Sequence, residues 1–306
     1  MKNKINPNWI TGFVDGEGCF SVHIAKRKNL KSGWHIQPCF QIKLHTKDKD
    51  LLLNVKSFFN EIGAISLDNK YNEVTYRVYK LNDIVNIIIP HFDKYLLITQ
   101  KYSDYILWKS IVKILDKGQH LNSKGLLKIV SLKASLNKGL SDKLKKEFPA
   151  TIKVKRSKVN IPNIIDYNWI AGFFSGEGCF YIDIYKAADC KMGCYVRLRA
   201  SVNQHSRDEI LINNLINRLN CGFVTKHTHK KVVTYVIYRF EDIYNKIIPI
   251  FNKYPILGVK SLDFKDFCKA AELINKKAHL TLEGLDKISK IKSNMNTGRI
   301  FYKMLY

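Results

Sequence analysis

The sequence predicts an α+β protein built from two copies of an αββαββα unit, and three observations lead to this fold class. NWITGFVDGEGCF at residues 8–20 returns as NWIAGFFSGEGCF at 168–180, a displacement of 160. In each copy, helical and alternating hydrophobic patterns follow one another in the same order. The length of 306 residues also suits two cores of ordinary size.

The repeat extends over nearly the whole chain. LHTKD at 44–48 returns as QHSRD at 204–208, and IIPHFDKY at 88–95 returns as IIPIFNKY at 247–254. The polar, basic segment 151–163, which contains Pro162, suits an exposed linker. We therefore predict domains at 1–150 and 164–306, arranged as a pseudo-two-fold pair.

The elements of the first copy can be assigned in order. Asn6 as N-cap and Pro7 at the first turn predict a helix that stops near Gly18. Residues 20–27 and 35–45 alternate as strands, 49–63 reads as a helix, 64–70 and 74–80 form a second strand pair, and 81–92 and 101–115 are helical. The inward side chains are expected to be Phe20, Val22, Ile24, Ile36, Phe40, Ile42, Leu44, Val74, Tyr76 and Val78, and Cys39 and Thr75 are expected to point outward with the polar residues. Each sheet then keeps one polar, basic face opposite its helices.

Composition narrows the class of partner. Lys and Arg number 51 against 26 Asp and Glu, giving a net charge of +25 with 46% hydrophobic residues. A folded, strongly basic protein attracts polyanions, most often nucleic acid, although a solubilising surface or anionic lipid gives the same signal. No apolar run approaches the ~18 residues that cross a membrane, and the first residues lack a signal-peptide core, so we expect a soluble chain without a membrane partner.

The cysteines do not predict a metal site. There are seven, without any CxxC pair, which indicates reduced thiols. Cys190 with Cys194, and His227 with His229, are an alternative zinc set, but neither spacing matches a usual site.

The repeated helix carries the strongest candidate residues. Gly12 and Gly16, and likewise Gly172 and Gly176, share a helical face, which predicts close packing of two helices; a bend is the alternative reading. Glu17 and Glu177 end these helices, where the macrodipole disfavours negative charge. Bringing the two carboxylates together would add repulsion, which a divalent cation would relieve. The alternative is two exposed acids that merely follow the repeat.

ITGFVDGEG and IAGFFSGEG resemble the LAGLIDADG motif, and the doubled unit is similar to single-chain LAGLIDADG homing endonucleases encoded in organellar introns. FQIKLHTKDKDLL, QHSRDEIL and the KYLLITQK/KYPILGVK pair extend the resemblance over both halves. It implies that Glu17 and Glu177 bind catalytic metal together with the backbone carbonyls of Gly16 and Gly176.

The resemblance carries further roles to matching positions. Gln41 is implied to position metal-bound water, whereas the second copy has Ser201 there, so the two strands are expected to be cut at different rates. Lys101 and Lys260 are implied to stabilise charge at the scissile phosphate, with exposed helix lysines as the alternative. Ser175 replaces Asp15 at a motif position that is not a metal ligand.

The polar sheet faces are expected to enter the major groove of DNA as a saddle. Arginine and lysine there would address guanine or phosphate, and glutamine and asparagine would address adenine; a solvated strand face is the alternative. The loops 26–33 and 227–231 would hold flanking phosphates. The candidate reading residues are Ser21, His23, Arg27, Gln37, Gln41, Lys43 and Arg77 in the first copy, and Tyr181, Asp183, Tyr185, Arg197, Arg199, Ser201 and Asn203 in the second. Because the copies differ, the target should be long and asymmetric.

The expected function is metal-dependent hydrolysis of one phosphodiester on each strand of double-stranded DNA by a monomer with internal pseudo-symmetry, leaving 3′ overhangs by resemblance. Mg²⁺ is the expected cofactor, with Mn²⁺ as a substitute and Ca²⁺ supporting binding without cleavage. Two alternatives stay open: a maturase that binds its host intron RNA, and a DNA-binding protein without chemistry. The bias toward Lys, Ile, Asn and Tyr agrees with the mitochondrial origin that the resemblance suggests.

Overall fold

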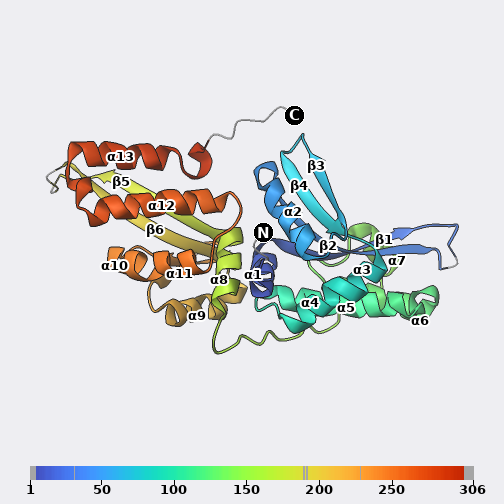
Figure 1. The fold of residues 1–306 in the computed structure, drawn as a ribbon. Helices are drawn as coiled ribbons and strands as arrows, with labels where there is room; N and C mark the ends of the chain where they lie inside the picture. Colours follow the sequence, from blue (N-terminus) through green and yellow to red (C-terminus); the bar gives the residue numbers. More distant parts are fainter. Residues whose placement is uncertain (1–4, 31, 189, 191, 228, 300–306) are drawn as a thin grey trace. The chain divides into compact units, whose positions relative to one another are not determined.

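The computed structural model describes residues 5–30, 32–188, 190, 192–227 and 229–299. The chain forms two compact units that divide after Pro162. Each unit repeats the same element order (Figure 1), and each is described by itself.

The first unit follows the predicted order and continues beyond it. Its elements are α1 (Pro7–Glu17), β1 (Gly18–Lys26), β2 (Trp34–His45), α2 (Lys49–Phe58), β3 (Ala64–Asp68), β4 (Glu73–Val78), α3 (Leu81–Asp83), α4 (Ile89–Lys94), α5 (Lys101–Asp116), α6 (Ser123–Ser135) and α7 (Asp142–Glu147). The antiparallel sheet has the order β1-β2-β4-β3.

The second unit repeats this sheet as β5-β6-β8-β7. Its elements are α8 (Tyr167–Glu177), β5 (Gly178–Lys186), β6 (Cys194–His205), α9 (Glu209–Leu219), β7 (Phe223–His227), β8 (Val232–Ile237), α10 (Phe240–Asp242), α11 (Ile248–Lys253), α12 (Lys260–Asn275) and α13 (Leu282–Ser293). The predicted α+β class is confirmed in both units.

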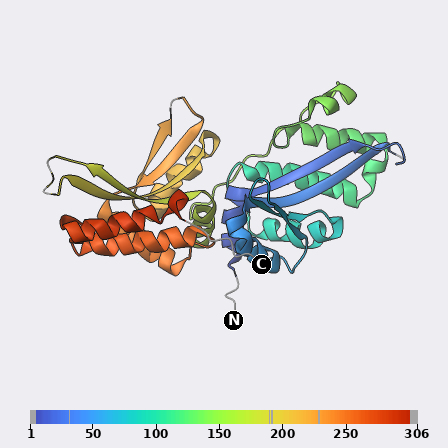
Figure 2. The same cartoon turned by 90° about the horizontal axis from the view of Figure 1, so that it is seen from above.

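One face of each sheet is covered by helices, as Figures 1 and 2 show. In the first unit Phe20 and Phe40 are cross-strand partners, and their ring centroids lie 5.3 Å apart. The Phe20 ring also packs against Phe92, Tyr105 and Trp108 of the covering helices. This aromatic cluster anchors the β1–β2 hairpin and leaves the opposite face of the sheet to polar side chains.

The alternation of buried and exposed side chains is less complete than predicted at four positions. Cys39 and Thr75 lie on the polar face by register, as predicted, yet they are only 6% and 4% exposed. The cross-strand partner of Cys39 is Ser21, and Thr75 lies between Lys43 and Ser66 of the two adjacent strands. Ile36 and Leu44, both expected inside, are only half-buried, one near each end of β2.

The segment after the last predicted helix differs between the units. In the first unit Asn137 N and the Arg156 guanidinium both donate to Asp104 Oδ1, at 2.8 Å each. The second unit repeats this arrangement with Asn296, Arg299 and Asp263. The first unit therefore inserts a long excursion, containing α7, between the two anchoring residues. Arg156 also ties the basic segment before the second unit to the first, so that segment is not uniformly exposed.

One turn of helix is widened to a π-helical turn at the same place in both units. Residues Ile84–Ile88 and Ile243–Ile247 form π-helical turns directly before α4 and α11. Each of these helices has a proline in its first turn, which lacks a backbone N–H donor. The sequence pattern predicted helix here but not the π-turn.

Candidate metal centre and nucleic-acid interface

Helix α1 delivers Glu17 to a sharp junction with strand β1. Asn6 caps the helix start by accepting a 2.8 Å hydrogen bond from Asn8 N, as predicted. At the other end Gly18 passes directly from helix to strand, where a Cβ atom would lie 2.4 Å from Val14 Cγ1. Gly178 has the same constraint against Phe174 in the second unit. A side chain at either glycine would push the carboxylate-bearing helix end away from its strand.

Asp15 fixes the segment that faces this helix end. Its carboxylate is 2% exposed and accepts hydrogen bonds from Ile98 N at 3.0 Å, Thr99 N at 3.2 Å and Thr99 Oγ1 at 2.5 Å. In the second unit Ser175 Oγ accepts from Leu257 N at 3.1 Å and donates to Ala171 O. Asp15 and Ser175 therefore serve the fold, and the exchange between them leaves the glutamates unchanged.

The two predicted lysines lie against the carbonyl oxygens that end the repeated helices. Lys101 Nζ donates to Val14 O and to Gly16 O, at 2.8 Å each. Lys260 Nζ donates to Gly176 O. A cation at a helix C-terminus is favourable because the exposed carbonyls carry partial negative charge. Both lysines are thus placed beside the glutamates, and they are not lysines on an open helix surface.

The groups at each helix end suit a hard divalent cation. A carboxylate and a backbone carbonyl supply oxygen ligands, which Mg²⁺ and Ca²⁺ prefer. The carbonyl oxygens of Gly16 and Gly176 already accept hydrogen bonds from ammonium groups, which demonstrates their affinity for positive charge. Within the described residues there is no group of three or more His, Cys, Asp or Glu that suits a metal, so a metal at these ends needs further oxygens from water or ligand.

Cys19 and Cys179 are the first side chains of the polar face beyond the glutamates. Burial raises the pKa of both thiols, so they stay protonated at neutral pH. A cysteine binds metal as the thiolate, so neither thiol competes with the carboxylates for a hard cation.

The strand register places the predicted reading residues of the first unit on one face. His23 pairs with Gln37, Gln41 pairs with Arg77, and Ser21 and Lys43 follow the same alternation. Arg77 donates to Gln41 Oε1 at 3.3 Å and to Ser66 Oγ at 2.8 Å. Arg27 lies in the turn that follows β1. Of the two predicted phosphate loops, residues 31 and 228 lie outside the described residues.

The second unit brings its predicted residues together in the same way. Tyr181 pairs with Arg199, Asp183 with Arg197, and the outermost Tyr185 with Tyr195. Ser201 pairs with Cys179, next to the helix end, and Asn203 lies further along β6, where its amide oxygen accepts from Thr234 Oγ1. The polar face is therefore continuous from the glutamate outward in each unit.

Sequence reasoning missed two residues that reach this face, Tyr238 and Lys292. Tyr238 follows β8 and lies 5.5 Å from the Arg197 guanidinium carbon. Lys292 Nζ lies 5.9 Å from the Tyr181 ring, and burial lowers the pKa of its repeat counterpart Lys133. The signal for the lysines was their common displacement of 159 in the repeat.

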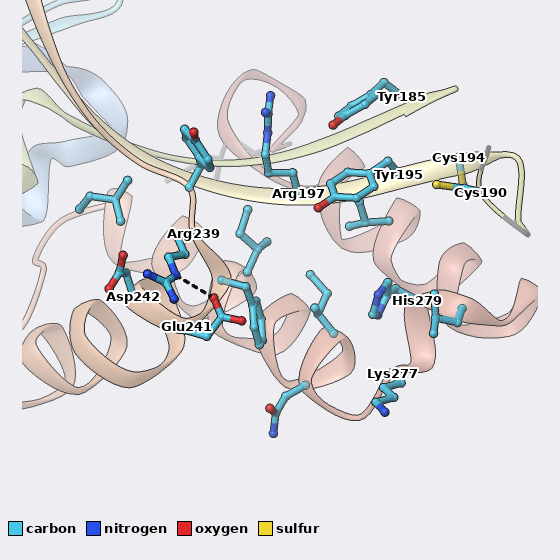
Figure 3. Close-up of a pocket in the computed structure, with 18 of the residues that line it drawn as sticks. Tyr185, Cys190, Cys194, Tyr195, Arg197, Arg239, Glu241, Asp242, Lys277 and His279 are labelled. Carbon is cyan, nitrogen blue, oxygen red and sulfur yellow. Dashed lines mark hydrogen bonds and ion pairs between the residues drawn. The ribbon is translucent and has the colours of Figure 1, made fainter. Parts of the chain in front are cut away.

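A cavity of about 990 Å³ lies away from the glutamates, at the outer end of the β5–β6 hairpin. Figure 3 shows Arg239, Glu241 and His279 on the helix side of the hairpin. In the first unit α7 fills the corresponding space: Phe148 packs on Trp34 at 5.0 Å, and Glu147 pairs with Lys26 at 2.9 Å. The repeat counterpart of Trp34 is the smaller Cys194. The second unit has no such excursion, and its cavity is lined by the predicted reading residues Tyr185 and Arg197 but by none of the predicted metal ligands.

Comparison with known proteins places this geometry in a family. The chain is 42% identical to Probable intron-encoded endonuclease 2 of Neurospora crassa over 95% of its own length, and it spans 65% of that relative. The chain also matches a second N. crassa relative, Probable intron-encoded endonuclease 3, and spans 54% of the length of that relative.

Solved structures match both units. The I-SmaMI LAGLIDADG homing endonuclease bound to cleaved DNA is 40% identical, with a TM-score of 0.94, 97% of this chain covered and 99% of that chain. I-SmaMI bound to its uncleaved DNA target in the presence of calcium ions is 41% identical, with a TM-score of 0.93. The match covers 96% of this chain and 99% of that chain. No helix in the described part of the chain is long and apolar enough to cross a membrane. The LAGLIDADG endonuclease family model matches residues 10–112 and 170–271, and the chain therefore belongs to this family.

Proposed function

We propose that this chain is a site-specific DNA endonuclease that uses divalent metal to hydrolyse one phosphodiester on each strand of a long, asymmetric duplex target. The observation that carries the proposal is the repeated helix end. There Glu17 and Glu177 each follow a glycine whose carbonyl oxygen accepts a hydrogen bond from a lysine ammonium group. The DNA-bound structures of 40% identical family members support the substrate. The chain spans only part of the length of its curated relatives, so the proposed endonuclease activity is that of this chain and not of the longer relatives.

The proposed metal ligands are the carboxylates of Glu17 and Glu177 and the carbonyls of Gly16 and Gly176, completed by water and DNA phosphate. When bound, the metal supplies Lewis acidity at the scissile phosphate and lowers the pKa of water. Mg²⁺ is the proposed ion for cleavage. Uncleaved target bound to I-SmaMI with calcium ions supports the expectation that Ca²⁺ permits binding alone.

Lys101 and Lys260 are proposed to stabilise the charge that develops on the phosphate. Each ammonium is held beside a glutamate by helix-end carbonyls, so it is oriented before the reaction. A similar solved structure is a variant of I-SmaMI with two lysines changed to alanine, and those lysines are separated by the same number of positions as Lys101 and Lys260.

Gln41 is proposed to orient the attacking water on one strand only. Its amide oxygen accepts from Arg77, and its side chain also lies against the thiol of Cys19 across the strand pair, so the amide has a fixed orientation next to the helix end. At the corresponding place Ser201 has Val236 in the position of Arg77. The two cleavage steps should therefore differ in rate, and the breaks should leave 3′ overhangs as the family resemblance implies.

The relatives' description as intron-encoded supports a gene within an intron, and we place that intron in a mitochondrial genome.

The test begins with selecting the target from a randomised duplex library by binding in Ca²⁺. Wild type, Glu17→Gln, Glu177→Gln and the double variant are then compared for cleavage of that target in Mg²⁺. The matched control is Glu73→Gln, which removes a carboxylate from the same unit, where it pairs with Lys43.

The double variant should bind the target in Ca²⁺ and produce neither nicks nor breaks in Mg²⁺, whereas Glu73→Gln should still cut. Full cleavage by the double variant would overturn the assignment of the glutamates. Specific binding by wild type without nicking in any divalent ion would identify a DNA-binding protein without chemistry. Failure to bind duplex, with rescue of host intron splicing, would identify a maturase.

A further inference from the structure

The polar faces of the two units differ most in the first hairpin. Five positions that are small or uncharged in the first unit become aromatic or charged in the second. Ser21, His23, Ala25, Gln37 and Cys39 correspond to Tyr181, Asp183, Tyr185, Arg197 and Arg199. A ligand that contacts these positions therefore contacts different side chains in the first and second units.

Arg197 is held between two aromatic rings. Its guanidinium carbon lies 5.5 Å from the ring centroid of Tyr185 and 5.5 Å from that of Tyr238. These distances allow cation–π attraction on both sides. Figure 3 shows Arg197 and Tyr185 on the side of β5 and β6 opposite to Arg239, Glu241 and His279. The guanidinium is thus fixed on the polar face before any ligand binds, which reduces the entropy lost on binding.

Asp183 lies directly across from Arg197 but does not satisfy it. The residues are cross-strand partners, and Asp183 Oδ2 lies 3.6 Å from Arg197 Nη2, an ion pair too long for a hydrogen bond. Arg197 Nε and Asp183 Oδ2 are both buried atoms without a hydrogen-bond partner among the described residues. Buried polar atoms are nearly always paired. Arg199 Nε is unpaired in the same way, so the Arg197 position differs by the unpaired carboxylate oxygen of Asp183 opposite it, which suits a ligand that donates as well as accepts.

We propose that Arg197 and Asp183 together read one G·C base pair in the half of the target bound by the second unit, with Tyr185 and Tyr238 as positioning residues. This inference rests on the proposed DNA-cutting function. Guanine offers O6 and N7 to an arginine in the major groove, and the N4 amino group of its paired cytosine donates to a carboxylate. A phosphate fits the site less well because Asp183 would repel it.

The neighbouring Arg199 provides a matched comparison. Its guanidinium carbon lies 5.2 Å from the Tyr181 ring, so it is also stacked, but its cross-strand partner is that tyrosine and not an acid. Positions 197 and 199 are about 6.6 Å apart along the strand, which corresponds to about two base pairs. A change at Arg199 should therefore leave preference at the Arg197 base pair intact.

The experiment is selection of randomised duplexes by the full chain in Ca²⁺, followed by sequencing. Wild type should enrich a site with a strongly preferred G·C pair, and Arg197→Gln should reduce the preference at that one pair roughly tenfold or more. Asp183→Asn should weaken the same position. Tyr185→Leu should do so in part, whereas Tyr185→Phe, which keeps the ring, should not. Arg199→Gln and Tyr79→Leu, the first-unit counterpart of Tyr238, serve as controls.

Uniform weakening by Arg197→Gln across all sequences, with a salt dependence reduced by about one phosphate contact, would overturn the proposal and assign Arg197 to the backbone. An unchanged profile would overturn it as well. If wild type enriches no sequence at all, the proposed function itself fails, and this outcome is distinguishable because it appears before any variant is compared.

Discussion

Replacing Asp15 with alanine should separate the role of this buried acid from that of Glu17, two positions along the same helix. The Asp15 carboxylate accepts three hydrogen bonds from the segment that leads into α5, two from backbone N–H groups and one from Thr99 Oγ1. Thr99 Oγ1 in turn accepts from Lys101 N. Loss of the carboxylate therefore loosens the turn that starts the lysine-bearing helix.

The expected magnitude follows from the donors left unpaired. Each buried donor without a partner costs about 1–3 kcal/mol. Entry of water satisfies part of this set, so Asp15→Ala should reduce the stability of the first unit by on the order of 3–5 kcal/mol. Ser175→Ala removes one acceptor from Leu257 N in the second unit and should cost about 1–2 kcal/mol.

Hydrogen exchange in increasing urea measures both effects within one chain. Peptides that contain residues 97–99 should lose protection in Asp15→Ala, and peptides that contain residues 256–258 should lose less in Ser175→Ala. DNA binding in Ca²⁺ should persist at low temperature. Equal small effects in the two variants, or unchanged protection at 97–99, would refute the reasoning.

Three further predictions use contrasts between the copies. Burial holds the pKa of His91 at about 3, so between about pH 6.5 and pH 3 the unfolded chain binds a proton that the folded chain does not. The free energy of unfolding should therefore fall by about 1.4 kcal/mol for each unit that the pH is lowered in this range. His91→Ile, which introduces the residue found at the repeat counterpart Ile250, should remove this contribution, as measured by urea titrations at several pH values. Lys101→Met and Lys260→Met should each slow cleavage by on the order of 10²-fold, on opposite strands, as measured with end-labelled duplexes. Phe148→Ala should lower the unfolding free energy of the first unit by roughly 1–2 kcal/mol, because it exposes Trp34.

The sequence was sufficient to predict the repeated framework. The period-two runs around Phe20 and Phe40 identified both strands of the first hairpin and their buried face. Asn6 and Gly18 predicted both ends of α1. These features are local, or are repeated at a fixed displacement, and so they are visible without knowledge of tertiary contacts.

Features that depend on long-range contacts were not predictable in the same way. Nothing near Thr75 in the sequence indicates that it is buried between Lys43 and Ser66 of the two adjacent strands. The excursion that carries α7 under Trp34 is visible only as unequal spacing between the anchoring residues Asn137 and Arg156 and their counterparts. The contacts of Lys101 with Val14 O and Gly16 O join residues more than 80 positions apart.

The site shows the same division. Repetition singled out Glu17 and Glu177, and the family resemblance supplied Gln41 and the two lysines. Tyr238 was missed because it lies just beyond the end of β8, where the alternation of side chains between the two sheet faces no longer applies. Its position beside Arg197 depends on pairing between β6 and β8, which connects distant parts of the chain.

The central claim is that Glu17 and Glu177, one from each repeat, bind the divalent metal that cleaves DNA. Anomalous diffraction from Mn²⁺ in a crystal of the full chain with its selected target tests it directly. The account predicts manganese within coordination distance of carboxylate oxygens of both Glu17 and Glu177, next to the scissile phosphates. Manganese bound elsewhere, with both carboxylates turned away from the metal and the DNA, would contradict it.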